Sequence, residues 1–346
     1  MAVYDTTEGK LRDLTRRIKK VTLNELLREW LEKHRDSDKI KDLTVIRYKC
    51  AISNYIEATL GQKEITEITR QDLEEFVEGQ KNHVGERTNA SLAPATIRCT
   101  VAVLKMVFRY AEEEGYISSS PCARVKAPKL ITKDTVTFTI EEQKLIEQEI
   151  IRQANDEYYG VLLSLYTGMS IGEVLALQWS DVDLENGTIE VSKTAATVRD
   201  ETGKWVETIN TPQTKTSNRT IPLPTFVVDD LKAMKERSNS CFVICKRKTG
   251  EPFGTKIYRY RFEVLLTKIG VELKNFNTLR HSFAERAIQS GMDTFTLALI
   301  LGHSTAFRTM AAYDGMLRAA RGEMRTLSRI GNQETNQRTN NRRINR

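Results

Sequence analysis

The chain has 346 residues, of which 40% are hydrophobic and 29% charged, values that suit a water-soluble protein with room for two domains. The 53 Lys and Arg exceed the 46 Asp and Glu, and the net charge of +7 allows a polyanionic partner without requiring one. No signal peptide or run of about eighteen apolar residues is present, and the five cysteines are scattered. These features argue against a membrane protein, a disulfide framework and a zinc site, and favour a reducing cytoplasm.

The N-terminal part predicts a helical domain behind a flexible basic lead-in over residues 1–20. Thr22 and Glu25 have the spacing of a capping box, in which each side chain hydrogen-bonds the other residue's backbone at the start of a helix. Further helices are expected over 42–58, over 69–80 with an end near Gly79, and from Pro94 onward. The helix from Pro94 has the clearest apolar face, made of Ile97, Val101, Leu104, Phe108 and Ala111.

Basic side chains occupy the polar faces of two of these helices and are candidates for contacting an anionic partner. They are Arg47 and Lys49 on the second helix and Arg98, Lys105 and Arg109 on the fourth. A solvated face without a ligand is the alternative for each of them. Prolines and the basic stretch ARVKAPKLITK then interrupt the helical pattern. We therefore predict a helical domain over 21–122, a linker over 123–134 and a second domain over 135–330.

The second domain is expected to combine helices with one β region. A capping box of Thr139 and Glu142 begins a helix over 140–154, and two helices within 158–179 are separated at Thr167–Gly168. Alternating Thr, Val and Ile predict strands between 187 and 224. Helices return over 225–237, 255–269 and 278–330, with breaks at Gly291, Gly302 and Gly315, before a polar basic tail over 331–346. The predicted fold class is α+β and mainly helical, with a small antiparallel β-sheet.

Four separated fragments carry a family resemblance: TGMSIGEVLALQWSDVD from residue 167, TPQTKTSNRTIPLP from 211, NTLRHSFAERAIQSGM from 277 and LGHSTAFRTMAAY from 301. In order and spacing they resemble the catalytic domain of tyrosine recombinases, the phage integrase family. The likeness covers 135–330, and 20–125 resembles that family's SAM-like core-binding domain. It implies a site-specific recombinase that cuts and rejoins DNA through a 3′-phosphotyrosine intermediate, without metal, cofactor or ATP, to integrate or excise a mobile element.

The resemblance also implies partners. Double-stranded DNA with specific recombination sites would be the substrate, and the five basic residues named above would bind it. The protein is expected to be monomeric when free and a homotetramer on DNA, with accessory DNA-bending proteins as further partners and no membrane contact. A C-terminal helix over 317–330 either passes to a neighbouring protomer or packs on its own domain.

Phosphoryl transfer places extra negative charge on the non-bridging phosphate oxygens, so fixed cationic donors should supply most of the catalysis. By resemblance, Arg280 clamps the scissile phosphate with a planar guanidinium fork. Lys215 is the general acid that protonates the departing 5′ oxygen, and His303 hydrogen-bonds the phosphate. Simpler roles compete with these: Arg280 on a helix surface, Lys215 as an exposed lysine and His303 as a helix cap.

Tyr313 matches the nucleophile of the family. A phenol has a pKa of about 10, so it needs nearby positive charge and a proton acceptor to react at neutral pH. The alternative is a buried core ring, but Asp314 and Gly315 follow directly and predict an exposed turn. His281 falls on no catalytic position of the family pattern, and we interpret it as a supporting or structural residue.

Two positions depart from the pattern. Ser170 stands where the family has its first arginine, and Asn277 where it has His or Lys. Losing one such donor typically costs about a hundred- to a thousandfold in rate. Ser170 and Glu173 also have capping-box spacing, so the serine is equally explained as an N-cap. The sequence leaves open whether Ser170 is natural variation, with an arginine of the β region such as Arg199 or Arg219 substituting, or an engineered change that traps a DNA complex.

Two other functions remain as alternatives. A type IB topoisomerase uses similar groups but relaxes supercoiled DNA as a monomer. A DNA-binding relative that keeps the fold without the activity is consistent with the departures at Ser170 and Asn277.

Overall fold

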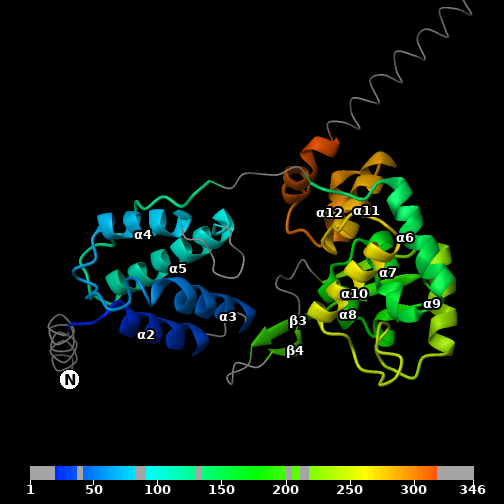
Figure 1. Cartoon of the computed structure of the whole chain (residues 1–346), viewed down its shortest axis with the longest axis horizontal. Helices are drawn as coiled ribbons and strands as arrows, with labels where there is room; N and C mark the ends of the chain where they lie inside the picture. The colour runs from blue at the N-terminus through cyan, green and yellow to red at the C-terminus, as the bar shows by residue number, and fades with distance from the viewer. Residues whose placement is uncertain are drawn as a thin grey trace, which may run out of the picture. The chain divides into compact units, whose positions relative to one another are not determined.

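The computed structural model describes residues 20–36, 42–82, 91–129, 135–199, 205–210 and 218–317. The chain divides into two compact units, Met1–Thr132 and Lys133–Arg346 (Figure 1). Several predictions fall outside the described residues: the lead-in up to residue 19, part of the linker, Lys215, the side chain of Arg199, the helix beyond Leu317 and the tail. No helix among the described residues is long and apolar enough to cross a bilayer.

The first unit packs its helices around one apolar core. Trp30, Leu104 and Phe108 are at most 1% exposed within it. The apolar residues predicted for the inner face of the helix that begins at Pro94 are all buried. The elements are α2 (Leu23–Asp36), α3 (Asp42–Ala51), the π-helical turn η1 (Ile52–Ile56), α4 (Arg70–Asn82) and α5 (Pro94–Glu113).

Of two helix ends that the sequence predicts in this unit from local signals, one is as predicted and one is not. The backbone N–H of Thr22 donates to the Glu25 carboxylate at 2.9 Å, and the N–H of Glu25 donates to the Thr22 hydroxyl, so the predicted capping box is confirmed. The prediction that Gly79 ends the third helix is wrong, since α4 continues to Asn82. Exposed glycine costs a helix only about 1 kcal/mol, and buried residues on both sides of Gly79, including Val77 and Gln80, hold α4 in place.

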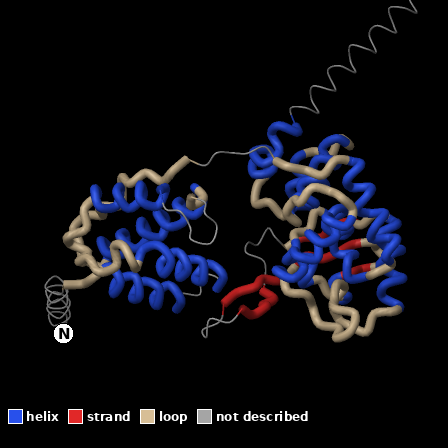
Figure 2. Tube along the Cα trace, viewed as in Figure 1, coloured by secondary structure: helices blue, strands red, loops and turns tan. Residues whose placement is uncertain are grey.

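The second unit packs helices around one small antiparallel sheet, and a second, two-stranded ribbon projects from its edge (Figure 2). The mainly helical α+β fold is confirmed. Its helices are α6 (Ile140–Gln153), α7 (Tyr159–Thr167), α8 (Ile171–Ala176), α9 (Thr225–Glu236), α10 (Thr255–Lys268), α11 (Asn277–Gln289) and α12 (Thr294–Leu301), with 3-10 turns at Asp156–Tyr158 and Trp179–Asp181. Its strands are β1 (Val182–Asp183), β2 (Thr188–Val191), β3 (Thr194–Arg199), β4 (Trp205–Asn210) and β5 (Arg219–Pro222).

The β region forms two sheets rather than the one predicted. Strands β1, β2 and β5 form a sheet in that order, while β3 and β4 form a separate two-stranded ribbon. In the first sheet Val191 pairs with Arg219, the first residue of β5. Because β5 contacts α12, this register places the Arg219 side chain near the C-terminal end of that helix.

The C-terminal part of the second unit is helical, as predicted, but one break is absent. Gly291 and Gly302 have φ values of 84° and 69° and follow the ends of α11 and α12. From Ala306 to Leu317 the chain is helical without interruption, and we call this segment the tyrosine helix. The predicted turn at Asp314–Gly315 is therefore wrong, because Tyr313 and Leu317 on one face of the tyrosine helix pack into an apolar cluster with α11 and α12.

Candidate active site

The turn between α7 and α8 requires glycine at position 168. Gly168 has a φ of 68°, and a Cβ there would lie 2.7 Å from Cδ1 of Phe283 and 2.8 Å from Cδ2 of Leu301. The Ser164 hydroxyl donates to the Met169 carbonyl at 2.8 Å, which fixes the chain after the turn. Gly168 and the Ser164 hydrogen bond therefore determine where residue 170 lies.

Ser170 is the N-cap of α8. Its hydroxyl accepts from the backbone N–H of Glu173 at 3.4 Å, and its own N–H donates to the Glu173 carboxylate at 2.7 Å. The capping-box interpretation of Ser170 is thus confirmed, and the position carries no charge. Glu173 is a structural partner of this turn as well as the anion of the site.

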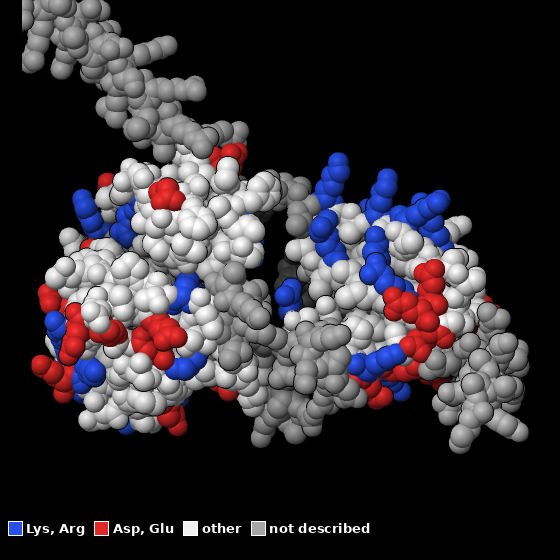
Figure 3. Space-filling view, turned by 180° about the vertical axis from the view of Figure 1, so that it is seen from behind, with Lys and Arg blue, Asp and Glu red and all other residues white. Residues whose placement is uncertain are grey.

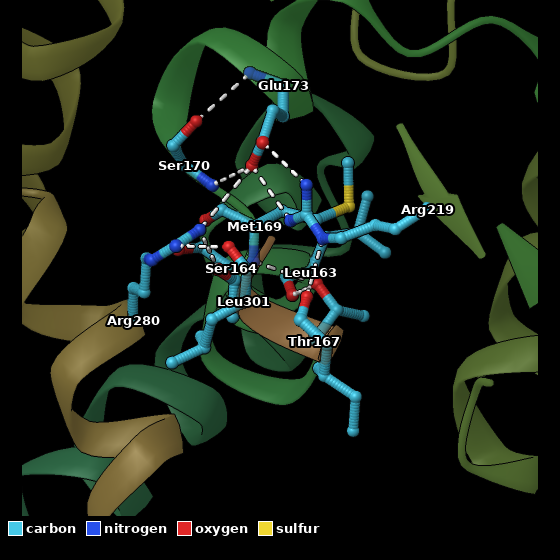
Figure 4. A network of polar contacts seen from close by, with 11 residues as sticks. Leu163, Ser164, Thr167, Met169, Ser170, Glu173, Arg219, Arg280 and Leu301 are labelled. Carbon is cyan, nitrogen blue, oxygen red and sulfur yellow. Dashed lines mark hydrogen bonds and ion pairs between the residues drawn. The ribbon is translucent and has the colours of Figure 1, made fainter. Parts of the chain in front are cut away.

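Arg219 and Glu173 form a buried bidentate ion pair (Figure 4). Nη1 of Arg219 lies 2.7 Å from Oε1 of Glu173 and Nη2 lies 3.1 Å from Oε2, while Nε donates to the Ile300 carbonyl at 2.5 Å. The Arg219 side chain is only 6% exposed. Strand β5 thus places an arginine, Arg219, close to Ser170, but the guanidinium of Arg219 already donates hydrogen bonds to protein acceptors.

Arg280 approaches the same carboxylate from α11. Its Nη1 donates to the Gly168 carbonyl at 2.9 Å and lies 3.7 Å from Oε2 of Glu173, and its Nη2 donates to the Leu301 carbonyl (Figure 4). Burial by itself would raise the pKa of Glu173, but Arg219 and then Arg280 lower it overall. Two guanidinium groups around one carboxylate leave this cluster with a net positive charge, which suits an anionic substrate.

His303 follows α12 and is half-buried beside these cations. Its Nδ1 is 2.8 Å from the hydroxyl of Thr309 on the tyrosine helix. Burial, and then the charges of Arg280 and Arg308, lower the pKa of His303 to about 4, so the ring is neutral at neutral pH. A hollow of about 410 Å³ beside the ring is lined also by Arg219, Phe295 and Leu299.

Tyr313 is a buried ring, 2% exposed, and the sequence-based expectation of an exposed position is wrong. Its ring packs against apolar residues of α11 and α12, and burial raises the pKa of its hydroxyl while the charge of Arg280 partly opposes that rise. The hydroxyl lies 3.0 Å from Nδ1 of His281, and Nε2 of His281 lies 2.9 Å from the Asn277 amide nitrogen.

The structure thus brings most of the predicted catalytic set together in the second unit. Arg280 interacts electrostatically with both His303 and Tyr313, and Asn277 joins the set through His281. Lys215 lies outside the described residues.

The five basic residues predicted to bind the partner are in the first unit. Figure 3 shows Lys and Arg side chains gathered along one edge of this unit. Within the described residues none of the five pairs with a carboxylate; Lys105 is half-buried, and the exposed ones are Arg47, Lys49, Arg98 and Arg109.

Sequence reasoning missed three members of this site. Glu173 was recognised only as a helix cap, Thr309 was not singled out, and His281 was assigned no position in the chemistry. The spacing did contain a signal for His281, since residues four apart on a helix share a face and His281 is four residues after Asn277. Nothing local indicates that Tyr313 lies beside this face, because that contact spans 32 residues.

Comparison with known proteins assigns the family. The model of the phage integrase family matches residues 134–315, and the model of the phage integrase N-terminal SAM-like domain matches residues 22–79. The chain belongs to the phage integrase family. Among the described residues of this integrase-family chain, no group of three or more His, Cys, Asp or Glu could hold a metal ion.

Curated relatives of this phage integrase family member are named recombinases or integrases. A tyrosine recombinase XerC-like protein of Caldanaerobacter subterraneus subsp. tengcongensis is 27% identical over 321 residues, which cover 85% of this chain and 79% of that protein. The ICEBs1 integrase of Bacillus subtilis is 26% identical over 283 residues, covering 77% of this chain and 72% of the relative.

Solved structures show the same fold. The Tn1549 transposon integrase in complex with transposon right end DNA superposes with a TM-score of 0.71 and 22% identity, covering 89% of this chain and 100% of that one. A lambda integrase tetramer bound to a Holliday junction gives a TM-score of 0.60 and 21% identity, covering 83% and 78%.

Proposed function

We propose that this protein is a site-specific DNA recombinase that cuts and rejoins DNA strands through a 3′-phosphotyrosine intermediate on Tyr313. The observation that supports this most is the cluster of Arg280, His303 and Tyr313, drawn from α11, from the end of α12 and from the tyrosine helix. Arg280 would bind two non-bridging oxygens of the scissile phosphate, and neutral His303 would donate a further hydrogen bond.

In the proposed reaction, the Tyr313 oxygen attacks phosphorus, the bond to the 5′ oxygen breaks, and that oxygen takes a proton. Lys215 is the proposed proton donor. The phosphodiester energy is kept in the tyrosine ester, so the reverse attack by a 5′ hydroxyl rejoins strands without ATP. Because Tyr313 is 2% exposed in the DNA-free chain, the groups that cover its hydroxyl must move before a phosphate can reach it.

We place this activity in the integration or excision of a mobile element, in the bacterial cytoplasm at the nucleoid. The names of the ICEBs1 and Tn1549 integrases support this assignment. Within the first unit, residues 21–122 would act as the core-binding domain and bind DNA with the basic side chains named above, while 123–134 links them to a catalytic domain over 135–330. We further propose a homotetramer on DNA from monomers in solution, with accessory DNA-bending proteins, and an activity attenuated by Ser170.

The test of this function is a covalent protein–DNA adduct that survives denaturation. The substrate is a nicked duplex that spans the junction between the element carrying the gene and its host DNA. Wild type should form the adduct, and Tyr313→Phe should form none while binding the duplex with similar affinity. Absence of an adduct on every junction duplex would instead support the second candidate, a DNA-binding relative without the activity. The buried Tyr313 hydroxyl and the departures at Ser170 and Asn277 favour that candidate. An adduct on unrelated supercoiled DNA, with relaxation, would indicate a topoisomerase.

Binding by the first unit should depend steeply on salt. Each phosphate contact releases condensed counterions. A plot of the logarithm of the affinity against the logarithm of the salt concentration therefore has a negative slope, with about 0.9 units for each contact. The double variant Arg98→Ala with Arg109→Ala should lower this slope by about two units. Arg70→Ala is the matched control, because Arg70 is already paired with Glu74 on α4, and it should leave the slope unchanged. Equal slopes in all three proteins would contradict the assigned DNA-binding face.

A further inference from the structure

The hydroxyl of Tyr313 has a defined basic partner in the DNA-free chain. Nδ1 of His281 lies 3.0 Å from this hydroxyl, and the two rings meet edge to face with their centroids 5.8 Å apart. His281 is carried by α11 directly after Arg280, the proposed phosphate clamp. The same turn of α11 therefore presents a guanidinium for the phosphate and an imidazole for the nucleophile.

Asn277 determines which ring nitrogen of His281 can accept a proton. Nε2 of His281 lies 2.9 Å from the Asn277 amide. In the structure Nδ2 of Asn277 faces the ring, and in this orientation the amide donates to Nε2 and the ring proton resides on Nδ1. With the amide turned by 180°, Oδ1 accepts from Nε2–H, and Nδ1 carries the lone pair that faces Tyr313. A lysine at position 277 would only donate and could not support this second tautomer.

We propose that His281 is the proton acceptor for Tyr313, with the Asn277 amide holding the tautomer that makes it one. In this step the Tyr313 Oη–H proton passes to Nδ1 of His281 as the oxygen–phosphorus bond forms and the bond from phosphorus to the 5′ oxygen breaks. The inference rests on the proposed function. The inference gives Asn277, which departs from the family's His or Lys, a chemical role. Selecting the tautomer of His281 requires a neutral side chain that can both donate and accept a hydrogen bond.

The electrostatic surroundings suit a neutral acceptor. Among the described residues, the charged and titratable groups that face His281 are Arg280 on the same helix, Tyr313 on the tyrosine helix and His303 after α12. Burial, followed by the charge of Arg280, lowers the pKa of His281 below its ordinary value, so the ring is unprotonated at neutral pH. Protonation of His281 in acid would remove the lone pair and stop the reaction.

The experiment uses the full chain and the junction duplex, with sulfur in place of the bridging 5′ oxygen at the scissile phosphate. A thiolate leaves without being protonated, because thiols have a pKa of about 8.5. The rate of adduct formation then depends on removal of the Tyr313 proton and no longer on the general acid. Wild type should give a rate that is level at neutral pH and falls below the ordinary histidine pKa of about 6.5.

Three variants divide the possibilities. His281→Gln keeps a hydrogen-bonding side chain but accepts no proton, so its rate should fall by about a hundredfold or more and rise continuously with pH. Asn277→Asp leaves His281 in place and raises its pKa, so the acid fall of the rate should move to higher pH. Gln289→Ala, an exposed change on the same helix, should behave as wild type.

The outcomes are distinct. Two results for His281→Gln would overturn the assignment: a rate within about threefold of wild type with the same pH profile, or a rate above wild type. His281 would then be a residue that only holds the Tyr313 ring in position. An unmoved profile in Asn277→Asp would do the same, even if His281→Gln proved unstable. If wild type forms no adduct that Tyr313→Phe abolishes, the proposed function itself fails, and the inference with it.

Discussion

Replacing Ser170 by arginine will accelerate formation of the Tyr313–DNA adduct by about a hundred- to a thousandfold. Ser170 supplies no charge, and Arg219 does not replace the missing group, because its guanidinium is bound to Glu173 and the Ile300 carbonyl and its side chain is only 6% exposed. An arginine at position 170 would add a cation beside Arg280, where the phosphate charge develops. The rate is measured under single-turnover conditions with the nicked junction duplex.

Two variants separate the added charge from the lost cap. Ser170→Ala removes the N-cap alone and should cost about 1 kcal/mol of stability, a downward shift of a few degrees in Tm, without accelerating the reaction. Ser170→Lys adds charge without a planar fork and should accelerate less than arginine. An unchanged rate in Ser170→Arg would mean that another cation already contacts the phosphate, and it would disprove attenuation by Ser170.

Arg280→Ala will slow adduct formation by about a thousandfold while weakening DNA binding far less. Among the charges that act on His303 and Tyr313, Arg280 has the largest effect on both. Its removal deletes donors that act on the transition state more than on bound DNA. Some loss of stability is expected too, because the Gly168 and Leu301 carbonyls lose their donor.

Arg286→Ala is the control for that stability loss. Arg286 is on the same helix, donates to the Leu165 carbonyl and lies over the Tyr166 ring, so its removal has a comparable structural cost away from the site. Its Tm should fall about as much as that of Arg280→Ala, with the adduct rate nearly unchanged. If both variants lost activity in proportion to stability, Arg280 would be a structural arginine only.

Much of the architecture was predictable because it depends on neighbours in the chain. The capping boxes at Thr22, Thr139 and Ser170 form as their spacing indicates, since the partners are only three residues apart. The apolar period of the helix after Pro94 correctly identified its buried face. Errors occurred where a local signal competed with packing: Gly79 and Gly315 suggested ends, yet buried residues on either side kept both helices continuous.

The sequence by itself determined the family, the fold class and the membership of Arg280, His303 and Tyr313 in one site, because order, spacing and helical period are properties of the chain alone. Only the tertiary structure decided how those residues are used. It paired Arg219 with Glu173 across 46 positions and placed the Tyr313 hydroxyl on His281 across 32. Burial and long-range contacts decide whether a guanidinium is available and whether a phenol is exposed, and no local pattern encodes either.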